Sequence, residues 1–283
     1  MKTIFGKEDA AQFRMICLER INEIDNERNA CLALSGGTDS MTILFSMLET
    51  GRKPECYTFY MQGYESRDLQ SSRHACKYFG LKLNEIVIPS SIDAIYNDIR
   101  RVIPFCEYPK KTIIQCMIPW LYIYAAMDCE KIINGIAGDD HYATEKNMMI
   151  AYAKGGENAV LKHRRLFDKD LNYSEANIVR LASHFGKKNE DFYATEKMEK
   201  FLLGYTYRAI NYPYAKKPSI MAFADYYKAE PFYRDLTEHC YQINSHLKNY
   251  HNALLQSKYN RRGAKDVVAI YNDIWRELKH EQD

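Results

Sequence analysis

The sequence predicts an α/β protein in which a doubly wound parallel sheet is followed by a helical C-terminal half. Two observations carry this prediction. Within residues 1–150, short apolar runs of strand length alternate with longer segments of helical periodicity. Such alternation is typical of parallel strands joined by right-handed helical crossovers. After Gly155 no comparable strand pattern is found, and helical patterns continue toward the C-terminus.

The alternation can be followed along the chain. Strands are predicted at 30–34, 55–61, 83–88 and 131–134, and helices at 8–26, 41–48, 66–79, 90–102 and 112–127. The third of these helices should begin at Ser66 and end at Gly80, because serine caps helix N-termini and glycine takes the left-handed conformation of a C-cap. In the second half, helices are expected at 174–185, 191–203, 218–260 and 264–271. We therefore expect an α/β domain at 1–150 and a helical, substrate-binding region at 151–283 packed on it.

Composition limits the classes of function. Hydrophobic residues make up 46% and charged residues 27% of the 283 positions, as in ordinary globular proteins. The net charge of +2 argues against a surface built mainly to hold a nucleic-acid backbone. No signal-peptide core and no long apolar run are found, so a cytoplasmic protein is expected. The eight cysteines form no Cys-x-x-Cys pair, and we expect buried free thiols in a reducing compartment.

The most informative stretch is the loop that follows the first predicted strand. The strand at 30–34 runs into Ser35-Gly36-Gly37-Thr38-Asp39-Ser40, and a helix follows at once. In a strand-loop-helix unit, backbone N–H groups and the helix N-terminus point toward an anion, and glycine lets the backbone approach a phosphate closely. The predicted phosphate-binding residues are therefore Leu34, Ser35, Gly36, Gly37, Thr38, Asp39 and Ser40.

A second loop with glycines and carboxylates follows the last strand of the α/β half. The strand at 131–134 runs into Gly135-Ile136-Ala137-Gly138-Asp139-Asp140. Carboxyl ends of parallel strands meet at one edge of a sheet, so both loops should face one crevice. Mg²⁺ binds few protein carboxylates together with substrate phosphates. Asp39, Asp139 and Asp140 are the predicted metal ligands, and Gly135 and Gly138 should contact the nucleotide; a polar turn capped by an aspartate is the alternative.

These loops resemble a known group of enzymes. SGGTDS resembles the Ser-Gly-Gly-x-Asp-Ser loop of the PP-loop ATP pyrophosphatases, which cleave ATP between its α- and β-phosphates and leave AMP on a carbonyl oxygen. Residues 57–68 and 74–81 are similar to the asparagine-synthetase segment in which a strand contacts adenine. That similarity implies an adenosine pocket at Tyr60 and Met61, which could equally be sheet core. Residues 135–140 resemble the Thr-Gly-Glu-Gly-Ser/Ala-Asp-Glu loop of asparagine and β-lactam synthetases, with Ala137 in place of its first acidic residue.

The resemblance implies a fold like that of the adenine nucleotide alpha hydrolases, with ATP and Mg²⁺ as cofactors. It is closest to the synthetase domain of asparagine synthetases, which adenylates a carboxyl group that ammonia then attacks. Those enzymes usually carry a glutaminase domain whose cysteine follows the initiator methionine, whereas Lys2 stands at that place here. Nitrogen is therefore expected as free ammonia, as an amine on a small-molecule acceptor, or from a separate glutaminase subunit. The sequence leaves open whether the protein forms a homo-oligomer.

The expected catalytic residues are Asp39, Asp139 and Lys265. Neither glycine loop contains a lysine or arginine, so a basic side chain from the helical half should reach the leaving pyrophosphate. Lys265 follows Arg261-Arg262-Gly263 at a predicted helix start. Arg261 and Arg262 are the competing candidates, and three solvent-facing charges are the alternative.

Two other functions remain open at the level of sequence. One is a PP-loop enzyme that modifies a nucleobase or a tRNA, against which stand the missing Cys-x-x-Cys pairs and the near-neutral charge. The other is an adenine-nucleotide-binding protein without turnover, which the replacement at Ala137 favours. Release of pyrophosphate from ATP would separate an enzyme from a binding protein.

Overall fold

The computed structural model describes residues 5–106, 111–136, 138, 150, 154–156, 158–159, 174–203, 217–230, 232 and 264–280. Its centre is a five-stranded sheet with the order β3-β2-β1-β4-β5. The strands are β1 (Cys31–Ala33), β2 (Cys56–Met61), β3 (Leu83–Ile88), β4 (Lys131–Asn134) and β5 (Lys188–Asp191). Every neighbouring pair is parallel, which confirms the predicted fold class.

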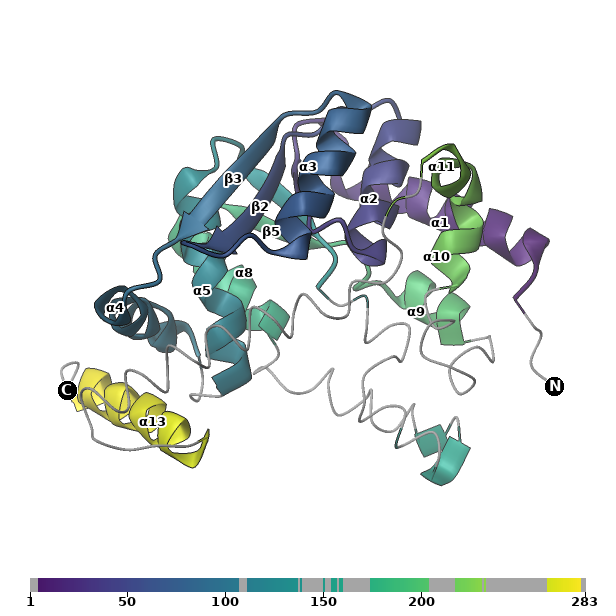
Figure 1. Cartoon of the computed structure of the whole chain (residues 1–283). Helices are drawn as coiled ribbons and strands as arrows, with labels where there is room; N and C mark the ends of the chain where they lie inside the picture. Colours follow the sequence, from purple (N-terminus) through teal and green to yellow (C-terminus); the bar gives the residue numbers. More distant parts are fainter. Residues whose placement is uncertain are drawn as a thin grey trace.

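Helices cover both faces of this sheet (Figure 1). One core contains side chains from α1 (Lys7–Ile24), α2 (Thr38–Glu49), α3 (Arg67–Phe79), α9 (Glu196–Leu203), α10 (Lys217–Ala222) and α11 (Ala224–Ala229). The other contains side chains from α4 (Ile92–Val102), the 3₁₀ turn η1 (Ile103–Phe105), α5 (Lys111–Ala126), α8 (Ser174–His184) and α13 (Ala264–His280). Adjacent strand residues divide between the cores, with Leu32 and Ile133 in the first and Cys31 and Ile132 in the second. This division follows from the two-residue period of a strand.

The predicted ends of α3 are confirmed. The Ser66 hydroxyl accepts a hydrogen bond from the backbone N–H of Leu69 at 3.1 Å, and Gly80 forms a left-handed C-cap with a φ of 63°. Within the described ranges, no helix has the length and hydropathy needed to cross a lipid bilayer.

The expectation that strands end before Gly155 is wrong. Residues 188–191 form β5 rather than a loop before a helix, and the helix expected from Asp191 begins only at Glu196. The strand pairs with β4 in the register Ile132 to Asn189 and Asn134 to Asp191. All four of its residues are polar, so no apolar pattern marks it. It forms because β4 would otherwise present an unpaired edge of backbone N–H and C=O groups.

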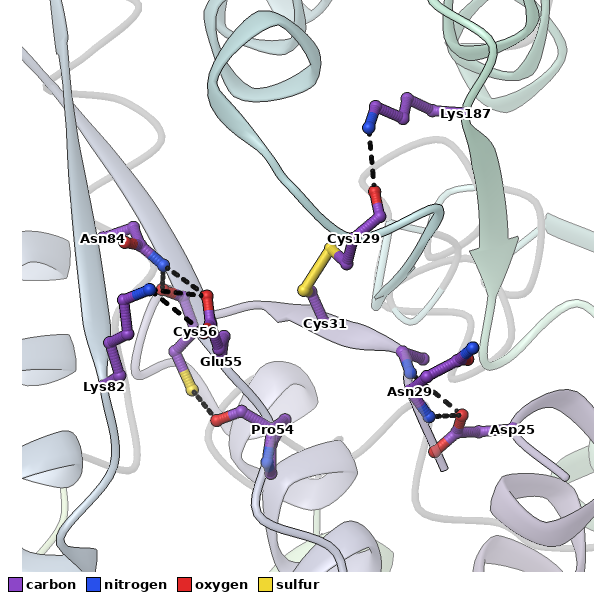
Figure 2. The surroundings of a disulfide bond; sticks show 11 residues. Asp25, Asn29, Cys31, Pro54, Glu55, Cys56, Lys82, Asn84, Cys129 and Lys187 are labelled. Atoms are coloured by element: carbon purple, nitrogen blue, oxygen red, sulfur yellow. Dashed lines mark hydrogen bonds and ion pairs between the residues drawn. A yellow bond between two sulfur atoms is a disulfide. The ribbon is translucent and has the colours of Figure 1, made fainter. Parts of the chain in front are cut away.

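The expectation of only free cysteines is also wrong, because Cys31 and Cys129 form a disulfide bond (Figure 2). Cys31 lies on β1 opposite Ile132 of β4, and Cys129 lies just before β4. The pairing of these two strands therefore brings together cysteines that are 98 residues apart in sequence, with their Cα atoms separated by 6.4 Å. Four other cysteines are free and buried, as expected: Cys17, Cys56, Cys76 and Cys106. Cys116 is also free, but it is exposed rather than buried. Cys240 lies outside the described residues.

Candidate functional site

The loop between β1 and α2 is closed on itself by its two serine hydroxyls. The Ser35 and Ser40 oxygens lie 3.1 Å apart. The Ser40 hydroxyl accepts from the backbone N–H of Ser35 at 3.3 Å and donates to the carbonyl of Gly37 at 3.1 Å. The Ser35 hydroxyl accepts from the N–H of Gly37 at 3.3 Å. These bonds fix the path of the backbone between the strand and the helix.

Helix α3 lies directly behind this loop. Gly36 has a φ of 75°, and a Cβ atom placed on it would lie 2.3 Å from Cβ and 3.0 Å from the carbonyl carbon of Ser71. Only glycine satisfies both the backbone conformation and this close approach. One residue further along α3, the hydroxyl of Ser72 donates to the carbonyl of Leu34 at 2.8 Å. The loop is therefore held against α3 from both sides of Ser35.

Helix α2 begins with features that favour an anion. Its N-cap residue is Gly37, which forms no side-chain cap hydrogen bond to the first N–H groups. The N–H groups and the dipole at a helix N-terminus stabilise a negative charge close to that terminus. Phosphate binding at Gly37 and Thr38 stays a prediction, and the start of α2 at these residues is compatible with it.

The two loops predicted from the sequence lie against each other at Asp39. A Cβ atom on Gly138 would lie 2.7 Å from Cγ and 2.8 Å from Oδ2 of Asp39, and one on Gly135 would lie 3.2 Å from its Cβ. The turn that carries these glycines is closed by a hydrogen bond from the N–H of Gly138 to the carbonyl of Gly135 at 3.1 Å. Both glycines leave room for the Asp39 carboxylate.

The remaining predicted residues fall in several places. Met61 is 1% exposed and packs in the core that contains α4 and α5, while Tyr60 is half-buried at the end of β2. Lys265 lies in the first turn of α13, a helix that packs on α4, α5 and η1. Asp139 and Asp140 lie outside the described residues, as do Ala137, Arg261 and Arg262.

Residues after β5 complete the surroundings of Asp39 and were not found by sequence reasoning. The hydroxyl of Tyr193 donates to the carbonyl oxygen of Asp39 at 3.3 Å, and its ring carbon Cε2 would lie 3.5 Å from a Cβ on Gly135. The N–H of Tyr193 donates to Oδ1 of Asp191 at 3.0 Å. The available signs that a strand ends here were the aromatic pair Phe192-Tyr193 and Thr195, whose hydroxyl accepts from the N–H of Met198 at 3.1 Å at the start of α9.

A buried carboxyl group lies in the first turn of α3. Asp68 is 4% exposed, and this burial raises the pKa of its carboxyl group to about 8. The loop at Gly36 packs on the next turn of the same helix. Burial therefore favours the protonated, uncharged form of this carboxyl group.

Comparisons with known proteins identify the family. The model of the asparagine synthase family matches residues 22–256, which include both glycine loops. No curated protein matches the chain. Among solved structures, an NMN synthetase from Francisella tularensis is 11% identical, with a TM-score of 0.37 over 86% of this chain and 94% of that one. The U34-tRNA thiolase NcsA from Methanococcus maripaludis, with its 4Fe–4S cluster, is 13% identical, with a TM-score of 0.32 over 86% of this chain and 78% of that one. Because the family match spans well over half of its residues, the chain belongs to the asparagine synthase family.

Proposed function

We propose that this protein is an ATP-dependent, AMP-forming enzyme that adenylates a carboxyl or carbonyl oxygen and releases pyrophosphate, after which ammonia or an amine displaces AMP. Membership of the asparagine synthase family supports an enzyme that uses ATP. The observation that carries the proposal is the loop at Ser35–Ser40, which packs on α3 through Gly36 and holds Asp39 against Gly138.

The chemistry explains why such a loop is needed. A carboxylate is a poor electrophile because it is negatively charged, and its oxygen is a poor leaving group. Transfer of AMP to that oxygen removes the charge and supplies a good leaving group, while the bond between the α- and β-phosphates of ATP breaks and pyrophosphate departs. The charge that develops on pyrophosphate must be stabilised, and fixed N–H groups at a helix N-terminus do so without reorganising. The loop and the first turn of α2 supply these groups.

The donor atoms present fit ATP with a bound Mg²⁺. No cluster of three or more His, Cys, Asp or Glu side chains able to hold a metal by itself is found among the residues that the structure describes. Mg²⁺ needs no such cluster, since one or two carboxylates and the substrate phosphates suffice. Asp39, with Asp139 or Asp140, would hold the ion, and the ion would neutralise charge on the leaving pyrophosphate.

The proposal is tested by measuring pyrophosphate release. The protein is incubated with ATP, Mg²⁺, ammonium and a panel of carboxylic acids that includes amino acids. We expect release with at least one acid, and a loss on the order of a hundredfold in Asp39→Asn, whose affinity for metal-free ATP stays close to that of the wild type. Asp93→Asn is the matched control, because Asp93 is an exposed aspartate in the first turn of α4. ATP binding without pyrophosphate release for any acid would contradict adenylation of a free carboxylic acid.

A further inference from the structure

The side chain of Tyr193 contacts both loops of the site. It is fully buried, its hydroxyl donates to the carbonyl of Asp39 at 3.3 Å, and its ring faces Gly135. Asp39 belongs to the loop after β1, whereas Gly135 follows β4. A single tyrosine from the end of β5 thus lies where the two loops meet.

Tyr193 is itself held in place by neighbouring elements. The N–H of Phe192 donates to the carbonyl of Asn134 at 3.0 Å, and the ring of Phe192 packs edge-on against that of Tyr193 at a centroid distance of 5.0 Å. From α1, the Arg20 guanidinium donates to the carbonyls of Asp191 at 2.9 Å and Phe192 at 3.3 Å. The backbone on both sides of the tyrosine is therefore fixed by β4 and α1.

We propose that Tyr193 is a positioning residue that fixes the backbone at Asp39 and thereby aims the Asp39 carboxylate at a metal ion bound to ATP. This inference rests on the proposed function. The ring alone would fill the same space in phenylalanine, so the specific contribution is the hydrogen bond from the hydroxyl. A Cβ atom on Gly138 would lie 2.8 Å from Oδ2 of Asp39, so the carboxylate occupies the space that this glycine leaves open, and the direction of the Asp39 backbone decides whether its oxygens reach that space.

The test compares two tyrosine-to-phenylalanine variants. Tyr193→Phe removes only the hydroxyl bound to Asp39. Tyr124→Phe is the matched control: Tyr124 is also buried, and its hydroxyl donates to Oδ1 of Asn189 on β5 at 3.0 Å, from the opposite face of the sheet. For each protein, the affinity for α,β-methylene-ATP is measured by calorimetry with Mg²⁺ and with EDTA, and thermal unfolding is recorded. This nucleotide is not cleaved between its α- and β-phosphates, so no acceptor is needed.

We expect Mg²⁺ to tighten nucleotide binding equally in the wild type and in Tyr124→Phe. In Tyr193→Phe the ratio of the Kd in EDTA to the Kd in Mg²⁺ should be about tenfold smaller, while the Kd in EDTA is unchanged. In an Asp39→Asn background, Tyr193→Phe should have no further effect, because the tyrosine acts through Asp39. An undiminished Mg²⁺ gain in Tyr193→Phe, an equal loss with and without Mg²⁺, or an additional loss in the Asp39→Asn background would overturn the inference and leave the proposed function standing. Failure of the wild type to bind the nucleotide at all would instead overturn the proposed function, and this inference with it.

Discussion

At Gly36 two independent constraints exclude every side chain. The positive φ disfavours any residue with a Cβ atom, and the approach to Ser71 leaves no room for one. The glycine-rich loop could be predicted from sequence because glycines and hydroxyls at a strand-to-helix junction carry a local signal. The role of Ser71 could not, because it depends on where α3 packs.

The two constraints at Gly36 can be separated with a second glycine. Gly63 has a φ of 81°, but a Cβ atom on it would meet nothing within 4 Å. Gly63→Ala should therefore lower the free energy of unfolding by about 1–2 kcal/mol, the cost of the left-handed conformation alone. Gly36→Ala should lower the free energy of unfolding clearly more than Gly63→Ala does. It should also weaken ATP binding, because the loop must move away from α3. Denaturant unfolding and nucleotide titration measure both effects, and equal losses in the two variants would contradict the proposed packing.

Asp68 gives the stability a defined dependence on pH. In the unfolded chain its carboxyl group has the ordinary pKa of 3.8, whereas burial raises the pKa to about 8 in the folded protein. Between these values the folded state binds the proton and the unfolded state does not, so the contribution of Asp68 to the free energy of unfolding falls as the pH rises from about 4 to about 8. Asp68→Asn should remove this slope. Urea unfolding at about pH 5 and about pH 8 measures it, and an unchanged slope in the variant would show that Asp68 titrates normally.

At the scale of elements, β5 is the strand that leads to Tyr193 and the one that sequence reasoning missed. The strands β1, β2, β3 and β4 could be predicted because apolar residues bounded by turns mark them. In β5 the run Lys188-Asn189-Glu190-Asp191 is wholly polar, and its conformation is set by the edge of β4 rather than by its own side chains. Tyr193 was missed for the same reason, since one tyrosine among 23 is informative only when the strand before it is known.

Asn134 joins β4, β5 and the second glycine loop, and its loss should affect all three. Its side chain is buried, donates to the carbonyl of Glu190 at 3.2 Å and accepts from the N–H of Ile136 at 2.9 Å. We expect Asn134→Ala to cost about 1–3 kcal/mol of unfolding free energy, because buried backbone groups lose their partners. It should also weaken ATP binding. Asn84→Ala on β3 is the control, because the Asn84 side chain is half-buried and its hydrogen bonds are 3.4 Å long. This variant should lose less unfolding free energy than Asn134→Ala and should bind ATP with unchanged affinity. A larger loss in Asn84→Ala than in Asn134→Ala would contradict the role given to Asn134.

At the scale of the whole molecule, the disulfide links the strands that lead to the two glycine loops. Cys31 and Cys129 lie at the amino ends of β1 and β4, and the loops leave from the carboxyl ends of the same strands. This pairing could not be predicted from spacing, because it depends on β1 and β4 being neighbours although β2, β3 and several helices separate them in sequence.

Reduction should therefore destabilise the protein. A cross-link between distant residues reduces the number of conformations open to the unfolded chain, and its loss typically lowers the free energy of unfolding by about 2–4 kcal/mol. Thermal unfolding with and without a dithiol reductant should show a lower Tm for the reduced wild type, whereas Cys129→Ser should be insensitive to the reductant. Peptide mass spectrometry without reduction should find the Cys31 and Cys129 peptides joined. Separate peptides and no change in Tm would contradict the bond.

The measurement that tests the central claim most directly is a crystal structure of the protein with α,β-methylene-ATP and Mg²⁺. The account predicts that the β- and γ-phosphates lie at the N-terminus of α2, beside Gly37 and Thr38 and in contact with backbone N–H groups of the loop at 35–40, and that an Asp39 oxygen binds the metal ion. A nucleotide bound elsewhere, with its phosphates touching none of these residues, would contradict it.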